Sequence, residues 1–127
     1  MATVKLGQAG FDELIAGNDM VLIDFWAAWC GPCRAFAPVF EKASEKYPDM
    51  VFAKVDTEAE QQLAAALGIY SIPTLMVFRD QVLLYAQAGA LPAAALEQLI
   101  TQVRELDMDK VREQIAAEKA DAGAARS

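Results

Sequence analysis

The chain has 127 residues, of which 55% are hydrophobic and 23% are charged, and this composition is typical of one soluble globular domain. The formal net charge of −7 argues against nucleic acid or an anionic membrane as a partner. The chain has no histidine and only two cysteines, which excludes Cys–His catalysis and a four-ligand zinc site built from thiolates and imidazoles within one chain.

The N-terminal segment and the short apolar runs predict a cytoplasmic protein. Residues 1–17 read MATVKLGQAGFDELIAG and lack the charged region and the long apolar region of a signal peptide. The apolar runs are far shorter than the ~20 residues that a membrane-spanning helix needs. In the cytosol thiols are kept reduced. A mature exported chain without its signal would read the same way, so a dedicated reductase of an exported pathway stays open as an alternative.

The first part of the chain predicts a strand, a helix and a second strand. Residues 3–6 alternate and predict a short first strand, and the apolar spacing within 11–17 predicts a helix. The segment 20–27, MVLIDFWA, is apolar except for Asp24. Such a run predicts a central strand that is buried on both faces.

The middle of the chain continues this alternation. After the second cysteine, apolar residues follow a helical period as far as Tyr47, which predicts one helix that begins near the cysteines. Pro38 lies inside this helix and predicts a kink. The segment 50–56 predicts a strand, and 59–68 predicts a short helix.

The segments 73–80 and 82–89 predict two strands joined by a tight turn at residues 80 and 81, although the turn lacks the usual glycine. A helix is expected to open after Pro92 and to continue to Val103. Helical crossovers imply parallel strand pairs, and the last two strands form an antiparallel hairpin. The sequence therefore predicts an α/β fold with a central mixed sheet of about five strands and helices on both faces.

The end of the chain differs from the rest. Residues 1–105 are expected to form the domain, and 106–127 a helical extension that is thinly amphipathic, with Asp107 or Asp109 as its cap. After Ala120 the sequence predicts fraying. Two interpretations stay open for this extension: a helix that packs loosely, and a helix that docks onto a partner.

The two cysteines, Cys30 and Cys33, enclose Gly31 and Pro32 in the stretch FWAAWCGPCR. A structural disulfide is a poor explanation, because the loop it would close is very short and a reducing cytosol disfavours it. A metal site would need ligands from a second chain. Two thiols at this spacing can instead exchange electrons with a partner disulfide and then close on each other, so a redox role is the favoured interpretation.

The position of the pair supports a redox role. Cys30 is expected at the N-terminus of a helix, where unpaired N–H groups and the helix dipole favour an anion and so a reactive thiolate. Cys33 lies one turn further on, is expected to be less accessible, and is placed to attack a mixed disulfide formed at Cys30. Pro32 suits the first helical turn, and Gly31 leaves the approach to sulfur open.

The stretch DFWAAWCGPCR resembles the active site of the thioredoxin family, and several separated motifs agree with this. They are Pro38, AKVD at 53–56, SIPT at 71–74 and the pair Gly89–Ala90. The resemblance covers about residues 1–105. It implies a thioredoxin fold and a dithiol–disulfide reductase activity, with Cys30 as the attacking cysteine and Cys33 as the resolving one.

The resemblance also implies roles for other residues. Asp24 would be a buried carboxylate behind the cysteines, with Lys54 as its neighbour. Burial should raise the pKa of Asp24, so that it could exchange a proton with Cys33 near neutral pH. The bond before Pro73 would be cis and face the disulfide. The residues expected at the substrate-binding surface are Trp29, Gly31, Pro32, Ile72, Pro73, Thr74, Gly89 and Ala90.

Gly-Pro between the cysteines, without a histidine, favours a reductant over an oxidase. The expected partners are oxidised proteins and an NADPH-dependent thioredoxin reductase, in electron transport and cell redox homeostasis. No cofactor is expected within this chain, because it has no glycine-rich dinucleotide motif, and no metal is expected. The alternative is a non-enzymatic binding module or co-chaperone that uses the groove and the C-terminal extension.

Overall fold

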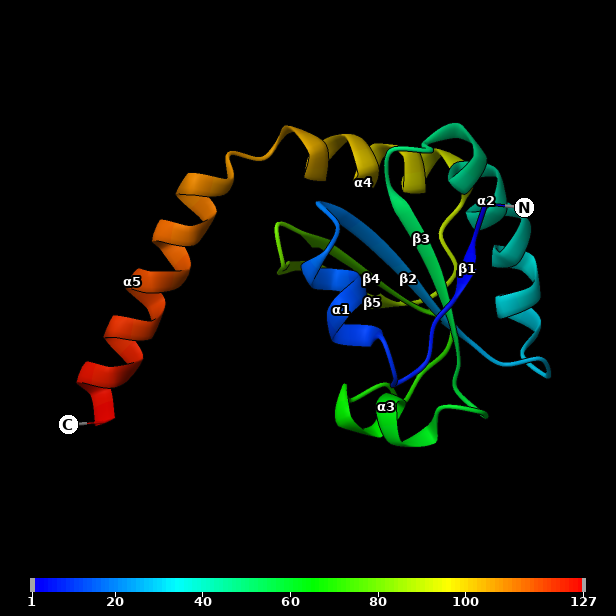
Figure 1. The fold of residues 1–127 in the computed structure, drawn as a ribbon, viewed down its shortest axis with the longest axis horizontal. Helices are drawn as coiled ribbons and strands as arrows, with labels where there is room; N and C mark the ends of the chain where they lie inside the picture. The colour runs from blue at the N-terminus through cyan, green and yellow to red at the C-terminus, as the bar shows by residue number, and fades with distance from the viewer. Residues whose placement is uncertain (1, 127) are drawn as a thin grey trace.

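The computed structural model describes residues 2–126, with side chains for residues 2–121. Five strands form one mixed sheet in the order β1-β3-β2-β4-β5, in which β1, β3 and β2 are parallel and β4 and β5 are antiparallel (Figure 1). The strands are β1 (Val4–Lys5), β2 (Met20–Trp26), β3 (Val51–Asp56), β4 (Thr74–Arg79) and β5 (Val82–Ala88). The helices are α1 (Phe11–Ala16), α2 (Gly31–Lys46), α3 (Gln61–Ala66), α4 (Ala93–Glu105) and α5 (Met108–Arg126). The mixed sheet that the sequence predicts is confirmed.

Two separate apolar clusters cover the two faces of the sheet. On one face α2 and α4 pack over Leu22 of β2 and Phe52 of β3. On the other face α1 and α3 pack over Val21 and Ile23 of β2. Residues 20–25 of β2 are therefore buried from both sides, as an apolar run of this length predicts. Neighbouring residues of β2 alternate between the two clusters, so even-numbered positions face α2.

The turn between β4 and β5 forms without glycine. Asp80 has φ 51° and Gln81 has φ 70°, so both central residues are in the left-handed region. This is the backbone of a type I′ turn, whose twist matches the twist of a hairpin. Aspartate tolerates this region better than most residues, whereas glutamine does not. The turn therefore carries local strain at Gln81 that the packing of the hairpin offsets.

Side-chain hydrogen bonds cap the end of α4 and the start of α5, where the chain leaves the sheet domain. The Arg79 side chain donates hydrogen bonds of 2.9 Å to the Val103 carbonyl and 2.7 Å to the Leu106 carbonyl at the end of α4. Asp107 then caps α5, since its Oδ1 accepts a hydrogen bond of 3.1 Å from the Asp109 amide. Of the two cap residues that the sequence offers, the structure uses Asp107.

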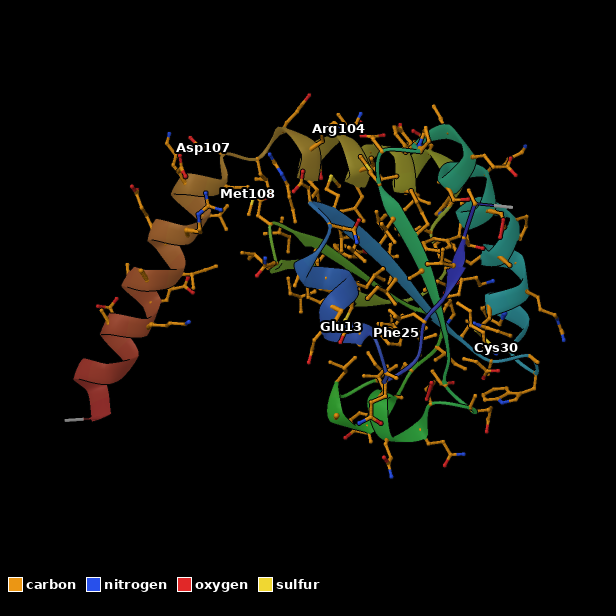
Figure 2. The ribbon with its side chains drawn as sticks, in the orientation of Figure 1. Glu13, Phe25, Cys30, Arg104, Asp107 and Met108 are labelled. Carbon is orange, nitrogen blue, oxygen red and sulfur yellow. A yellow bond between two sulfur atoms is a disulfide. The ribbon has the colours of Figure 1, made fainter. Side chains whose placement is uncertain are left out.

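The helix α5 points away from the sheet domain (Figures 1 and 2). Its first residue, Met108, is buried, and Arg112 lies 3.6 Å from the Asp80 carboxylate in the β4–β5 turn. The helix α5 is described as far as Arg126, and the fraying expected after Ala120 stays a prediction. Within residues 2–126, no helix carries an apolar stretch that could cross a membrane.

Candidate active site

A disulfide joins Cys30 and Cys33 at the start of α2, with their Cα atoms 5.2 Å apart. Cys30 is the N-cap residue in extended conformation, and its sulfur accepts a hydrogen bond of 3.1 Å from the Cys33 amide. Gly31 and Pro32 form the exposed first turn. The Cys33 amide, in the first turn of a 16-residue helix, thus points at Cys30 Sγ, where this amide and the helix dipole favour a negative charge on sulfur once the disulfide is reduced.

Neighbouring side chains cover the disulfide. Cys30 is 4% exposed and Cys33 is 2% exposed, so the expected difference in accessibility is small in this oxidised state. Trp26 and Ile72 pack against the pair, and the Ile72 carbonyl lies 3.7 Å from Cys30 Sγ. A partner can reach this sulfur only by lying closely against the surface around it.

The segment before β4 lies beside Cys30. The Ile72–Pro73 peptide bond is cis, as the resemblance implies. The Gly89 amide donates a hydrogen bond of 2.8 Å to the Pro73 carbonyl, which brings the end of β5 next to the segment before β4. Gly89 has φ +113°, a conformation that side-chain-bearing residues rarely adopt. The structure thus brings together Ile72, Pro73 and Gly89. Thr74 is buried at the start of β4, and Ala90 is exposed after Gly89.

Trp29, directly before Cys30, is an exposed aromatic side chain with a fixed orientation. It is 67% exposed, and its indole Nε1 donates a hydrogen bond of 2.7 Å to Glu58 Oε1. The segment that carries Glu58 is itself held, because the Glu58 amide donates to Asp56 Oδ1 at 2.9 Å. The indole therefore stands beside the disulfide while its polar edge is satisfied.

Asp24 is fully buried in the middle of β2, on the α2 face of the sheet. Neither of its carboxylate oxygens has a hydrogen-bond partner among the described residues. Burial raises the pKa of Asp24 from 3.8 to about 6, and the charge of Lys54 partly opposes this increase. The Asp24 carboxylate therefore does not reach solvent.

Lys54 is paired with Asp24 in the register of β2 and β3. Its side chain is half-buried, and its Nζ lies 5.1 Å from the centre of the Trp26 ring. Lys54, Trp26 and residues of β1 line a hollow of about 360 Å³. The cation thus acts on the carboxylate as a nearby charge, and the Trp26 ring stabilises it.

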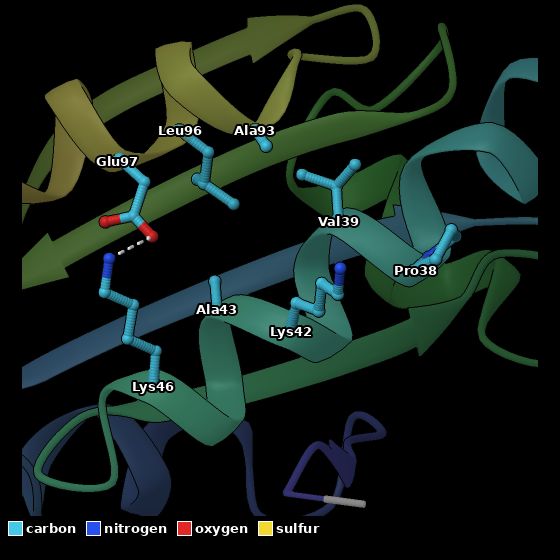
Figure 3. Close-up of a pocket in the computed structure, with 8 residues that line it drawn as sticks. All are labelled: Pro38, Val39, Lys42, Ala43, Lys46, Ala93, Leu96 and Glu97. Carbon is cyan, nitrogen blue, oxygen red and sulfur yellow. Dashed lines mark ion pairs between the residues drawn. The ribbon is translucent and has the colours of Figure 1, made fainter.

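A larger hollow of about 430 Å³ lies between α2 and α4, as Figure 3 shows. Its apolar lining includes Val39 and Leu96, and a salt bridge of 3.2 Å between Lys46 and Glu97 lies at its side. None of the predicted site residues lines it, and neither cysteine borders it. It is therefore not the site of the chemistry.

Two contributors to the site are missing from the residues that the sequence predicts. Trp26 lies two residues from Asp24 on the same face of β2, and the period of a strand could have found it. Glu58 lies in an exposed acidic segment, and no pattern in that segment points to Trp29. Among residues 2–126, no group of three or more acidic or cysteine side chains is arranged to hold a metal ion.

Comparisons with known proteins agree in pointing to one family. The Thioredoxin family model matches residues 2–102. A protein described as putative thioredoxin 2 of Streptomyces coelicolor is 58% identical over 122 residues, which cover 96% of this chain and 91% of that protein. A thioredoxin of Alicyclobacillus acidocaldarius is 41% identical over 103 residues, which cover 80% of this chain and 98% of that protein.

Solved structures are similar in both fold and sequence. A mutant thioredoxin from Halobacterium salinarum superposes with a TM-score of 0.75 at 38% identity, covering 82% of this chain and 92% of that chain. The oxidised thioredoxin of Plasmodium falciparum gives a TM-score of 0.70 at 36% identity, covering 80% of this chain and 97% of that chain. The matched part of this chain is thus close to the whole length of these structures.

Proposed function

Since the chain belongs to the thioredoxin family and is a protein dithiol–disulfide oxidoreductase, we propose that it reduces protein disulfides through a mixed disulfide at Cys30. The observation that carries this proposal is the place of Cys30 at the N-cap of α2, with its sulfur 3.1 Å from the Cys33 amide. A sulfur in that position is stabilised as a thiolate, and the thiolate is the form that attacks a disulfide.

The reaction consists of two exchanges. The reduced Cys30 thiolate attacks one sulfur of the substrate disulfide, forms a mixed disulfide, and releases the other substrate sulfur as a thiolate. Cys33 then loses its proton, attacks Cys30 Sγ, closes the Cys30–Cys33 disulfide, and releases the second substrate thiolate. Two electrons pass from the cysteine pair to the substrate, and one proton, that of Cys33, leaves the pair, because Cys30 already reacts as a thiolate.

We assign the proton transfer at Cys33 to Asp24. What supports this is the burial of the carboxylate on the α2 face of the sheet, together with its pKa of about 6. Near pH 7 such a group is mostly ionised and can accept the proton of a thiol, and it can return that proton readily. Lys54 would act as a positioning residue whose charge keeps the pKa of Asp24 from rising further.

The exposed surface around the disulfide would hold the substrate chain. The hydrogen bond from the Gly89 amide to the Pro73 carbonyl holds the two backbone segments of this surface together beside Ile72. Trp29 would contribute contact area, while Gly31 and Pro32 leave the approach to Cys30 open, since both are exposed and Gly31 has no side chain. Thr74 and Ala90 would complete the groove on either side of Pro73 and Gly89.

The family implies disulfide substrates and a reductase partner in general. We propose that this reductase is an NADPH-dependent thioredoxin reductase, that the protein works in the cytoplasm, and that it serves electron transport and cell redox homeostasis there. No cofactor or metal is assigned to the chain itself. The electrons from NADPH would arrive through thiol–disulfide exchange at Cys30.

The test is reduction of insulin disulfides with NADPH and a thioredoxin reductase, followed by trapping. The wild-type protein should turn over many times. Cys33→Ser should stall as a covalent mixed disulfide with its substrate, and Cys30→Ser should form none. The opposite result would be a folded wild-type protein that does not reduce insulin, together with a Cys33→Ser variant that forms no mixed disulfide. That result would favour a binding module or co-chaperone.

A further inference from the structure

Two exposed aromatic side chains stand near the disulfide, and only one of them is among the predicted site residues. Tyr70 is 85% exposed and Trp29 is 67% exposed, whereas the other exposed large hydrophobic side chains range from 40% to 45%. A single exposed apolar side chain needs no explanation. Two that exceed the others, one directly before Cys30 in the chain and one two residues before Ile72, indicate a contact surface.

Tyr70 lies on the segment that leads from α3 to the cis peptide bond. It stands two residues before Ile72, whose carbonyl is 3.7 Å from Cys30 Sγ. Two residues of extended chain span at most about 7 Å, so the Tyr70 backbone lies within about three substrate residues of the disulfide. The base of the segment is held by a hydrogen bond of 2.9 Å from the Ile69 amide to the Ala64 carbonyl. The tyrosine is therefore presented from a fixed position.

A hollow of about 300 Å³ lies beside Tyr70, between this segment and the end of the β4–β5 hairpin. Its lining carries no charged side chain, although the chain holds 11 basic and 18 acidic residues. A hollow of this size is at the lower limit for a small-molecule site and suits one side chain of a bound peptide. An uncharged lining with apolar members favours an apolar or aromatic side chain. The lining residues are Leu67, Gly68, Ile69, Tyr70, Ser71, Thr74, Met76, Ala86 and Ala88.

We propose that Tyr70 is a specificity-determining residue, which together with this hollow binds an apolar or aromatic side chain next to the reactive cysteine of the protein substrate. The inference rests on the proposed function, because it names the class of substrate segment that the redox site takes. A tyrosine suits this task, since it offers a large contact area and loses little conformational freedom on binding.

The test uses synthetic peptides with one disulfide, in which a single Phe is moved from three positions before the reactive cysteine to three positions after it, with Ser elsewhere. The second-order rate of reduction by the reduced protein is measured for each peptide and for bis(2-hydroxyethyl) disulfide, which is too small to reach the hollow. The proteins are the wild type, Tyr70→Ala, Tyr70→Phe and Leu83→Ala. Leu83 is a matched control, because it is 45% exposed and lines a separate hollow with Phe78.

For the wild type and Leu83→Ala, the peptide with Phe at one of these positions should be reduced about tenfold faster than the all-Ser peptide. This ratio of rates corresponds to ~1.4 kcal/mol. Tyr70→Phe should keep this preference, because the ring is retained. Tyr70→Ala should reduce it to about twofold or less, with its rate on the small disulfide unchanged. A preference that survives in Tyr70→Ala, or is absent from the wild type, overturns the inference. A wild type that reduces neither peptides nor the small disulfide would instead refute the proposed function.

Discussion

Replacing Asp24 by asparagine should make the oxidised protein more stable above pH 6 but not in acid. The pKa of Asp24 is about 6 in the folded protein and 3.8 in its ordinary surroundings. The difference of about 2.2 corresponds to ~3 kcal/mol at about 1.36 kcal/mol for each pH unit. The cause is burial, since Asp24 is fully buried and without a hydrogen-bond partner among the described residues.

The sign follows from proton binding. Between pH 3.8 and about 6 the folded protein holds the Asp24 proton while the unfolded chain has lost it. Raising the pH through this window therefore favours unfolding, and the whole cost is present above pH 6. Below pH 3.8 the carboxyl is protonated in both states and the ionic cost disappears. The amide introduced by Asp24→Asn cannot ionise, so the variant lacks this dependence.

Urea unfolding of the oxidised proteins at a series of pH values between about 3.5 and 8 measures the effect, because the free energy of unfolding is obtained at each pH. The difference between Asp24→Asn and wild type should change by ~3 kcal/mol across the series in favour of the variant. Its value at the acid end gives the cost of burying the amide, which is subtracted. Asp121→Asn is the control, since this exposed aspartate on α5 should leave the profile unchanged. Parallel profiles for wild type and Asp24→Asn would refute the reasoning.

Three smaller predictions concern the surface and the turns. Glu58→Ala removes the acceptor of the Trp29 indole, and should change the tryptophan fluorescence and lower the rate of protein-disulfide reduction by about threefold, whereas Glu58→Gln should retain both. Gly89→Ala meets no atom within 4 Å but forces alanine to φ +113°, so thermal unfolding should show a loss of ~1–2 kcal/mol. Gln81→Gly removes the strain of a side-chain-bearing residue at φ 70° in the hairpin turn, and urea unfolding should show a free energy of unfolding that is ~0.5–1 kcal/mol higher. No gain would mean that the Gln81 hydrogen bond to the Ala16 carbonyl outweighs the strain.

The sequence predicts the fold well where hydrophobic periodicity decides it. The segment 20–27 is apolar enough that only a strand covered on both sides suits it, and the structure buries residues 20–25 of β2. The hairpin is a harder case. Apolar patterning on both sides of residues 80 and 81 predicts the pairing, but without glycine it does not predict the turn type. The fold imposes positive φ on Asp80 and Gln81 because the strand pairing on either side is worth more than the local strain.

The site divides in the same way. Cys30 and Cys33 can be predicted because their spacing and their place before a helix are local features of the chain. The contact of Trp29 with Glu58 joins residues that are 29 positions apart and has no pattern of its own. The near-equal burial of the two sulfurs also depends on the tertiary fold, since Ile72 reaches them from the segment before β4.

The arrangement around Asp24 links stability to the proposed reaction. An unpaired carboxylate in the middle of β2 destabilises the fold, and leucine at this even-numbered position would extend the cluster that Leu22 begins. The same burial gives Asp24 a pKa of about 6, so its carboxylate can accept a proton from a thiol at neutral pH. A hydrogen bond to the carboxylate would lower that pKa and make Asp24 a weaker base. The free energy that the fold loses at Asp24 is therefore the physical source of the basicity that the proposed resolving step at Cys33 requires.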